Sequence, residues 1–435
     1  MRRWSGRSFK GGQAMILYRG VIYDNQEQNR LLDSLKDDIY ETLKTTKYPS
    51  IETVINACDQ LAKQVLNHKY DDIAVPLLNA LNIPYSMLEQ YVSYFAKAGL
   101  QKKVEIELGD LLKGDINLDK NTMRSYRPLG VLFHVAAGNV DLLPAYTVIE
   151  GLLVGNINIL KLPTGDNGLS LTLLKALIDI EPSLKDYIYV FDIPSVEIES
   201  IKRLSLLSDA TVVWGGEAVN KAAREFVDIH SSLIVWGHKI SFSYVDENIT
   251  DEELEKLAES ICLSNQLLCS SAQGIYLNTN DVKECHVLAQ RFLPILAKVS
   301  HRLNTLPLTM KAKNTLLNYN EKLEGNSDNI YQQDGVSIRV SEEQKLELSY
   351  LYQNVWIKPL AKDEIISVLK ENKNLLQTVS INQKIKDKEE IIDSLLKAGL
   401  VRIVNLGDNS RMINGEAHDG EYPLRRYIRI VEKVA

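Results

Sequence analysis

The sequence predicts an α/β protein in which a helical N-terminal segment precedes two doubly wound α/β domains. Apolar residues recur at three- and four-residue steps from about Gln26 to Ala98, which is the pattern of amphipathic helices. After Arg127, short β-branched runs alternate with helical stretches, the order that right-handed βαβ units require. These changes of pattern give a helical segment, two α/β domains and a C-terminal loop and strand, with expected bounds 15–115, 116–245, 246–406 and 407–435.

The helical segment is expected to begin after a short stretch that is not native. Lys10-Gly11-Gly12 is what a translated ribosome-binding site would encode, so Met15 is the expected biological start. Beyond it, the apolar face of the predicted helices is carried by residues such as Leu31, Leu35 and Ile39, separated by charged positions.

The first α/β domain is predicted from five short strands with a helix between each pair. The strands are expected at 131–136, 157–162, 186–191, 210–214 and 232–236, and the helices near 142–154, 168–180, 196–206 and 217–228. This spacing leaves room for the crossover that parallel pairing needs, so we expect a parallel sheet. Such sheets bind ligands at the carboxyl ends of their strands.

The second α/β domain shows the same alternation less regularly. Helices are expected near 251–264 and 280–300, and strands at 274–277, 336–340, 354–360, 375–381 and 401–406. The polar stretch 314–335 is predicted to be a surface excursion. Residues 426–434 alternate like a strand and are expected to join a sheet of this chain or of a neighbouring subunit.

Composition excludes several classes of function. With 45% hydrophobic residues, a net charge of -7 and no basic stripe, the chain has no feature that would bind nucleic acid. Its four cysteines form neither a disulfide framework nor a zinc motif, so no metal is implied and a reducing cytoplasm is expected. No apolar stretch reaches the length of a membrane helix, and the N-terminus lacks the apolar core of a signal peptide.

Cys269 is the strongest candidate for a catalytic residue. It lies in the run NQLLCSSAQ, among small polar residues, whereas a structural cysteine usually lies among aliphatic ones. The local sequence leaves both interpretations open, a nucleophile and a small buried residue. Cys262 lies on the apolar face of a predicted helix, and Cys58 and Cys285 are likewise expected to be structural.

Several residues that follow predicted strands are candidates for a binding site. Asn139 is either a turn residue or an amide donor to an oxyanion, and Lys161 either a solvated lysine or a cofactor ligand. Gly215-Gly216 precedes a predicted helix and is either a plain turn or a site for a pyrophosphate. No G-x-G-x-x-G motif follows any of the strands. Among the seven histidines, His134, His238 and His418 are the candidates for a site role.

Taken in order, these motifs resemble the aldehyde dehydrogenase superfamily, and within it the acyl-CoA reductases typified by the fatty acid reductase of bacterial luminescence. RPLGVLFHVAAGNVDLLP is similar to the catalytic-asparagine segment, NINILKLP to the cofactor-lysine strand and ATVVWGGEAV to the pyrophosphate turn. VWGHKIS and NQLLCSSAQ are similar to the glutamate-bearing segment and the nucleophile loop. The resemblance spans about residues 120 to 435 and is weak in the helical segment.

The resemblance implies an aldehyde-dehydrogenase-like fold, with 116–245 as the NAD(P)-binding domain and 246–406 as the catalytic domain. It implies that the Cys269 thiolate takes the acyl group, that Asn139 stabilises the oxyanion and that Lys161 binds the adenosine ribose. Gly215 and Gly216 would then border the pyrophosphate.

Two departures from the superfamily pattern narrow the expected chemistry. Val235 stands where hydrolytic relatives carry a glutamate general base, so the thioester is expected to be resolved by a thiol or by hydride and not by water. Thr164 stands where NAD-preferring relatives often carry a glutamate. A neutral residue does not repel a 2′-phosphate, so we expect NADPH, with NADH as the second choice.

The expected function is reduction of an acyl-CoA or acyl carrier protein thioester to an aldehyde in the cytoplasm, by a homo-oligomer that can work with an acyl-protein synthetase. One alternative is an NAD-dependent, CoA-acylating aldehyde dehydrogenase for short-chain aldehydes. An alternative of another class is a non-catalytic scaffold that binds an acyl-activating partner enzyme.

Overall fold

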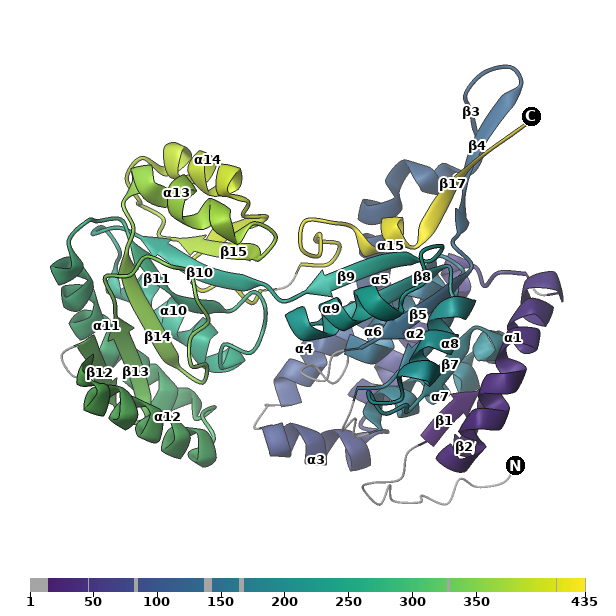
Figure 1. Cartoon of the computed structure of the whole chain (residues 1–435), viewed down its shortest axis with the longest axis horizontal. Coiled ribbons are helices and arrows are strands. Elements are labelled where there is room, and N and C mark those ends of the chain that lie inside the picture. Colours follow the sequence, from purple (N-terminus) through teal and green to yellow (C-terminus); the bar gives the residue numbers. More distant parts are fainter. Residues whose placement is uncertain are drawn as a thin grey trace. The chain divides into compact units, whose positions relative to one another are not determined.

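The computed structural model describes residues 15–45, 47–81, 85–136, 143–163, 168–326, 329–411 and 413–434. The chain forms two compact units (Figure 1). Unit 1 consists of Met1–Gly237 and Ile413–Ala435, and unit 2 of His238–Met412. The stretch 1–14, expected to be non-native, lies outside the described residues.

Unit 1 is built on a seven-stranded sheet with the strand order β2-β1-β7-β6-β5-β8-β9. Its strands are β1 (Met15–Tyr18), β2 (Val21–Asp24), β5 (Val131–Val135), β6 (Ile157–Lys161), β7 (Ile188–Phe191), β8 (Ala210–Gly215) and β9 (Ser232–Gly237). The five predicted strands are confirmed, and β5 to β9 pair in parallel. Their carboxyl ends share one edge of the sheet, hereafter the carboxyl edge.

The hairpin of β1 and β2 corrects the prediction that the chain is helical from residue 15 onward. The turn between them is Arg19-Gly20, and both residues have positive φ angles, 47° and 77°. Such a turn matches the twist of paired strands. β1 adds antiparallel to β7, so the sheet is mixed. The run is only four residues long, which is too short for periodicity to separate strand from helix.

The helices of unit 1 share one apolar core with this sheet, and the first five of them lie in the predicted helical segment. They are α1 (Gln28–Thr45), α2 (Ile51–Leu66), α3 (Asp71–Leu81), α4 (Tyr85–Phe95), α5 (Lys97–Leu108), α6 (Leu143–Leu153), α7 (Leu169–Ile180), α8 (Ile198–Leu207), α9 (Glu217–Phe226) and α15 (Pro423–Arg426). α2 shows why they form: the Ser50 hydroxyl accepts from the Thr53 amide, capping the helix, and one face is apolar and buried.

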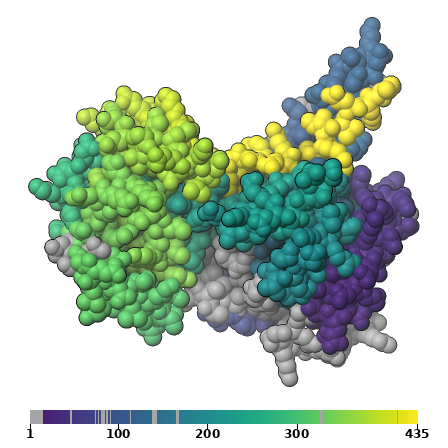
Figure 2. Space-filling view, viewed as in Figure 1, coloured from purple at the N-terminus to yellow at the C-terminus, as the bar shows by residue number. Residues whose placement is uncertain are grey.

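The C-terminal strand belongs to a second, three-stranded sheet of unit 1. β17 (Ile428–Val434) pairs antiparallel along the whole of β4 (Thr122–Pro128), which also pairs with β3 (Ile116–Asn117). Figures 1 and 2 show the C-terminal segment beside the β3–β4 hairpin. The predicted strand is therefore confirmed, and its partner is a strand of the same chain.

Unit 2 contains a second seven-stranded sheet with the order β12-β13-β14-β11-β10-β15-β16. Its strands are β10 (Ile240–Val245), β11 (Ala272–Leu277), β12 (Ile330–Gln333), β13 (Val336–Val340), β14 (Asn354–Pro359), β15 (Leu376–Ile381) and β16 (Arg402–Asn405). Its α-helices are α10 (Asp251–Ser264), α11 (Val282–Leu303), α12 (Leu308–Glu321), α13 (Ile365–Leu369) and α14 (Lys388–Ala398). The five strands predicted for this domain are confirmed.

Two predictions in unit 2 need correction. The stretch 314–335 is largely exposed, but it is not irregular as expected, because α12 continues to Glu321 and β12 follows. Its asparagines misled the prediction: Asn314 and Asn318 are buried, and the Asn314 amide donates to the Tyr352 carbonyl at 2.8 Å. β10 had no predicted counterpart, and it pairs with β11 and β15 inside this sheet.

Among the described residues, no helix is both long and apolar enough to cross a membrane.

Candidate functional site

Cys269 lies in the loop that joins α10 to the central strand β11, and its surroundings differ from those of the other cysteines. Cys269 is partly exposed, whereas Cys58, Cys262 and Cys285 are buried. Burial raises the pKa of each of these three thiols to about 12, so they stay protonated near neutral pH. The three expected structural cysteines thus lack what a nucleophile needs.

The Cys269 loop is held from within by Gln266. Asn265 and Gln266 end α10 with positive φ angles of 46° and 62°, a conformation that non-glycine residues adopt only when other contacts hold it. Those contacts are present, because the buried Gln266 amide donates to the carbonyls of Ala272, Gln273 and Asn354 at 3.1 to 3.2 Å. The residues around Cys269 therefore occupy a fixed conformation.

The main chain of Cys269 itself is anchored to β10. The Ser241 hydroxyl donates to the Cys269 carbonyl at 2.6 Å and accepts from the Thr378 amide at 3.0 Å. Ser241 is fully buried, so this bridge lies inside the sheet. A rigid main chain is the condition for placing a reacting sulfur reproducibly.

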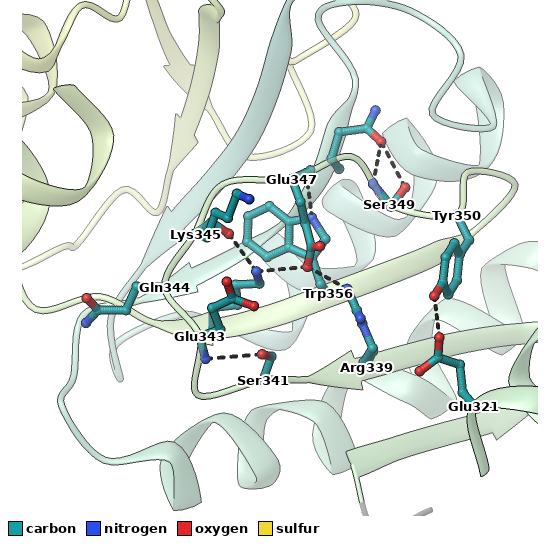
Figure 3. A network of polar contacts seen from close by, with 12 residues as sticks. Glu321, Arg339, Ser341, Glu343, Gln344, Lys345, Glu347, Ser349, Tyr350 and Trp356 are labelled. Carbon is teal, nitrogen blue, oxygen red and sulfur yellow. Dashed lines mark hydrogen bonds and ion pairs between the residues drawn. The ribbon is translucent and has the colours of Figure 1, made fainter. Parts of the chain in front are cut away.

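The stretch 341–353, between β13 and β14, is held by a network of polar contacts (Figure 3) and binds to β11 directly after the Cys269 loop. The Ser349 amide and hydroxyl both donate to the Gln273 side chain, and the Trp356 indole donates to the Glu347 carbonyl at 3.1 Å. The buried Lys358 ammonium contacts Glu347 at 2.8 Å. Burial lowers the pKa of Lys358, and the Glu347 carboxylate opposes this effect.

Of the predicted site residues in unit 1, Asn139 and Thr164 lie outside the described residues. Lys161 ends β6 at the carboxyl edge, and its ammonium donates to the Leu162 carbonyl at 2.9 Å. Burial lowers the pKa of Lys161, an effect that nearby Asp192 counteracts. It is a buried lysine, which corrects the alternative of a solvated one.

Gly215 and Gly216 lie where β8 passes into α9. Gly216 is the N-cap of α9 and no side chain caps this helix, so the first amides of α9 have no side-chain acceptor there. A Cβ on Gly216 would have no atom within 4 Å, whereas one on Gly215 would lie 3.1 Å from Val219. The turn therefore presents an open helix N-terminus at the carboxyl edge, which suits an anionic group.

The three candidate histidines fall into different environments. His238 is exposed directly after β9. His134 is fully buried on β5, and burial lowers its pKa to about 4. His418 lies in the C-terminal loop of unit 1, where its ring packs against Trp214 and Trp236.

His134 belongs to a buried chain of hydrogen bonds whose direction can be assigned. The Asn158 amide nitrogen donates to a carbonyl, so its oxygen accepts from His134 Nε2 at 2.9 Å. His134 Nδ1 then accepts from the Thr147 hydroxyl at 2.9 Å, and that oxygen accepts from the Trp214 indole at 3.3 Å. This arrangement requires a neutral imidazole, so His134 is a structural residue that orients Trp214.

Thr147, Trp214 and Trp236 were not predicted from the sequence. The two tryptophans are paired one residue before the ends of β8 and β9, each followed by the last glycine of its strand, and this repeated Trp-Gly pair was the available signal. Among the described residues, no cluster of acidic, histidine or cysteine side chains could hold a metal ion.

Comparison with known proteins gives both a family and a fold. Residues 46–430 match the family model described as acyl-CoA reductase (LuxC). Proteins named long-chain acyl-protein thioester reductase are similar. The one from Photorhabdus laumondii subsp. laumondii is 26% identical over 355 residues, covering 77% of this chain and 70% of that protein. The one from Vibrio harveyi is 26% identical over 349 residues, covering 77% and 71%.

Two solved structures show the likeness in fold. Aldehyde dehydrogenase 21 from Physcomitrella patens has a TM-score of 0.70 at 12% identity, covering 93% of this chain and 90% of that one. Lactaldehyde dehydrogenase from Escherichia coli has a TM-score of 0.68 at 12% identity, covering 98% and 96%. The predicted aldehyde-dehydrogenase-like α/β fold is therefore confirmed.

Proposed function

We propose that this chain, which belongs to the acyl-CoA reductase (LuxC) family, reduces an acyl thioester to an aldehyde through a covalent acyl group on Cys269. One observation carries the proposal: Cys269 is partly exposed in a rigid loop, whereas the other three cysteines are buried and protonated. The names of the similar proteins support an acyl thioester as the substrate.

Each proposed residue has a defined role. The Cys269 thiolate attacks the thioester carbonyl, and the Asn139 amide stabilises the oxyanion that forms. Val235, half-buried on β9, has no group that could activate water. The acyl group on Cys269 is therefore kept from hydrolysis until it is reduced.

The residues of unit 1 fit a nicotinamide cofactor. The open N-terminus of α9 at Gly216 would hold the pyrophosphate, because its amides lack a side-chain cap and no atom fills the space beside its Cα. Lys161 would bind the adenosine ribose from the same edge. When bound, the reduced nicotinamide supplies hydride. The neutral Thr164 favours NADPH over NADH, because it does not repel a 2′-phosphate.

The test is reduction by purified protein of short-, medium- and long-chain acyl-CoA, with NADPH and with NADH. We expect aldehyde and free thiol in equal amounts, a higher kcat/KM for NADPH, and no turnover by Cys269→Ala. Cys262→Ala, a change in a buried cysteine of the same unit, is the matched control. Aldehyde formation by Cys269→Ala would contradict the proposal, and equal kcat/KM values would contradict the cofactor preference.

The acyl donor and the assembly are part of the proposal. An acyl-CoA, an acyl carrier protein or an acyl-protein synthetase could present the acyl group in the cytoplasm, and the names of the relatives favour an acylated protein. We also propose a homo-oligomer, because β17 is an edge strand with exposed apolar residues, Ile430 and Val434. Light scattering of the purified protein measures the oligomeric state directly.

A further inference from the structure

We propose that segment 349–353, the end of the stretch between β13 and β14, positions Cys269 for acyl transfer. The inference rests on the proposed function and assigns Ser349 and Gln353 as positioning residues, which act on Cys269 through the loop that carries it. All of these residues belong to unit 2. Attack on a thioester carbonyl requires the sulfur about 3 to 3.5 Å from the carbon in a defined direction, so the main chain that carries the sulfur must be fixed.

Segment 349–353 has a strained main chain. Leu351, Tyr352 and Gln353 are consecutive, and their φ angles are 61°, 49° and 69°. Residues with a Cβ adopt this left-handed conformation at a cost of about 1 to 3 kcal/mol each, and they keep it only where other contacts hold them. A glycine would adopt it without this cost, and none of the three is a glycine. Such strain collects where a structure must hold residues in a particular place.

The contacts that hold this strain come from the start of the Cys269 loop. The Tyr352 amide donates to the Asn265 carbonyl at 3.0 Å. The Gln353 amide donates to the Gln266 side-chain oxygen at 3.0 Å. The buried Gln353 side chain donates in turn to Asn265 Oδ1 at 3.0 Å. Because Asn265 and Gln266 are themselves left-handed, two strained segments hold each other in place.

Gln273 extends this connection to the other end of the loop. Its side-chain amide donates to the Gln266 carbonyl at 3.0 Å and, more weakly, to the Ser271 carbonyl at 3.4 Å. Its side-chain oxygen accepts from the Ser349 amide at 3.3 Å and from the Ser349 hydroxyl at 2.8 Å. Segment 349–353 is therefore bonded to the beginning of the Cys269 loop directly and to its end through Gln273.

Cys269 lies between these two ends, in a tight turn. The Ser271 amide donates to the Leu268 carbonyl at 3.0 Å, which makes Cys269 and Ser270 the central residues of a β-turn. Because the turn is closed and both ends of the loop are held, a shift of either end moves the main chain of Cys269. A displacement of about 1 Å at a reacting atom can cost about 10²-fold in rate.

The residues that lead into segment 349–353 are docked on the sheet, as Figure 3 shows. The buried Lys358 ammonium donates to the Lys345 carbonyl at 2.6 Å and contacts the Glu347 carboxylate at 2.8 Å. Arg339 on β13 also pairs with Glu347. The segment thus has a fixed base on β13 and β14, from which it can hold the Cys269 loop.

A positioning role and a purely structural role predict different results. Alkylation of Cys269 by iodoacetamide requires only an accessible thiolate, whereas acyl transfer also requires the sulfur to point in one direction. Loss of position therefore slows acyl transfer and leaves alkylation unchanged. Loss of structure lowers the melting temperature and makes the buried Cys262 reactive.

The first test is single-turnover acyl transfer from acyl-CoA to the full-length protein without cofactor, followed as thiol release. Gln353→Met removes the amide that binds Asn265 and keeps the main-chain hydrogen bond to Gln266. We expect it to slow acyl transfer by about 10- to 100-fold and to leave alkylation of Cys269 near the wild-type rate. Ser341→Ala, the matched control, removes a hydroxyl that accepts within the same stretch and should change neither rate.

A double-mutant cycle tests whether Ser349 acts through Gln273. Ser349 is partly exposed, so Ser349→Ala should fold, and the loss of one hydrogen bond should slow acyl transfer by about 2- to 10-fold. In a Gln273→Met background the same change should have no further effect, because the acceptor is gone. If Gln353→Met is too unstable to purify, this cycle decides the question.

Wild-type acyl transfer in both Gln353→Met and Ser349→Ala would overturn the proposal. Equal slowing of acyl transfer and alkylation, or additive effects of Ser349→Ala and Gln273→Met, would overturn it too. Absence of acyl transfer in the wild-type protein would instead refute the proposed function.

Discussion

Cys269 differs from the other cysteines in its exposure to solvent, which determines how easily a thiol can lose its proton. A thiolate in the place of Cys58, Cys262 or Cys285 would lose its hydration without gaining a partner that offsets the loss, and so the pKa of each of these thiols is raised to about 12. Cys269 is partly exposed and is followed by Ser270 and Ser271. The polar neighbours seen in the sequence therefore correspond to a real difference in access to solvent.

This difference predicts selective alkylation. Limiting iodoacetamide near pH 8 should modify Cys269 first, because only thiolates react and the three buried thiols are both protonated and covered. Mass spectrometry of the digested native protein measures the modified fraction of each cysteine. Comparable modification of Cys262 and Cys269 in the folded protein would argue against the assignment.

His134 predicts a loss of stability in acid. Its pKa is lowered to about 4 in the folded protein, against about 6.5 unfolded, so the unfolded chain binds more protons between these values. The free energy of unfolding should therefore be fully retained above pH 6.5 and fall by roughly 3 kcal/mol as the pH drops to 4.

Urea unfolding across this pH range, compared between the wild type and His134→Phe, measures the effect. The variant should be less stable at neutral pH, because Asn158 and Thr147 lose a partner, but its stability should depend less on pH. An identical pH dependence in both proteins would show that His134 does not titrate as inferred.

At the scale of elements, the α9 N-terminus combines an open backbone with a conformation that alanine tolerates. Gly216 has a φ angle of -73°, and a Cβ added to it would have no atom within 4 Å, so folding does not require a glycine there. We attribute the glycine to the approach of a pyrophosphate.

Gly216→Ala should therefore leave the melting temperature unchanged and weaken cofactor binding by about 10- to 100-fold, the loss of one charge-assisted hydrogen bond. Titration calorimetry with NADPH measures the dissociation constant, and thermal unfolding checks the fold. An unchanged dissociation constant would place the pyrophosphate elsewhere.

The elements show which parts of the structure the sequence could predict. The five strands of the first domain were found because they are β-branched runs with helices between them. β10 was missed because Ser241 and Ser243 make it look half-exposed, although both faces are buried and Ser243 pairs with Ser380 at 2.8 Å. The polar composition did not indicate α12, because two of its asparagines, Asn314 and Asn318, are buried, and Asn314 donates to the Tyr352 carbonyl.

The candidate site was predictable only in part. Cys269, Lys161 and the glycine turn lie in short local motifs, which order along the chain and family resemblance could identify. The contacts that hold them join distant segments, as Ser241 does with Cys269 and Thr147 with Trp214. The order of residues along the chain carries no signal for such pairs. The packing of His418 against Trp214 and Trp236 is therefore visible only in the folded structure.

At the scale of the whole molecule, each unit has its own sheet and its own apolar core. The described core clusters of unit 2 contain none of the residues that form the cluster of unit 1. The chain leaves unit 1 at Gly237 and returns to it at Ile413. Independent cores predict independent unfolding, which departs from two-state behaviour.

Differential scanning calorimetry should therefore resolve two transitions, and Gly274→Ala should shift only one of them. A Cβ on Gly274 would lie 2.0 Å from the Trp356 ring, so the change overpacks unit 2 and should cost about 1 to 3 kcal/mol. Gly216→Ala in unit 1 is the matched control. A single transition, or a shift of both by Gly274→Ala, would contradict independent cores.

The central step of the proposed reaction is the transfer of an acyl group to Cys269. Intact-mass spectrometry after incubation with acyl thioester and no cofactor tests it most directly. We predict a mass increase of one acyl group, located by digestion on the peptide that carries Cys269, and its loss as aldehyde when NADPH is added. An acyl adduct on another residue, an adduct that NADPH does not discharge, or acylation of Cys269→Ala would contradict the account.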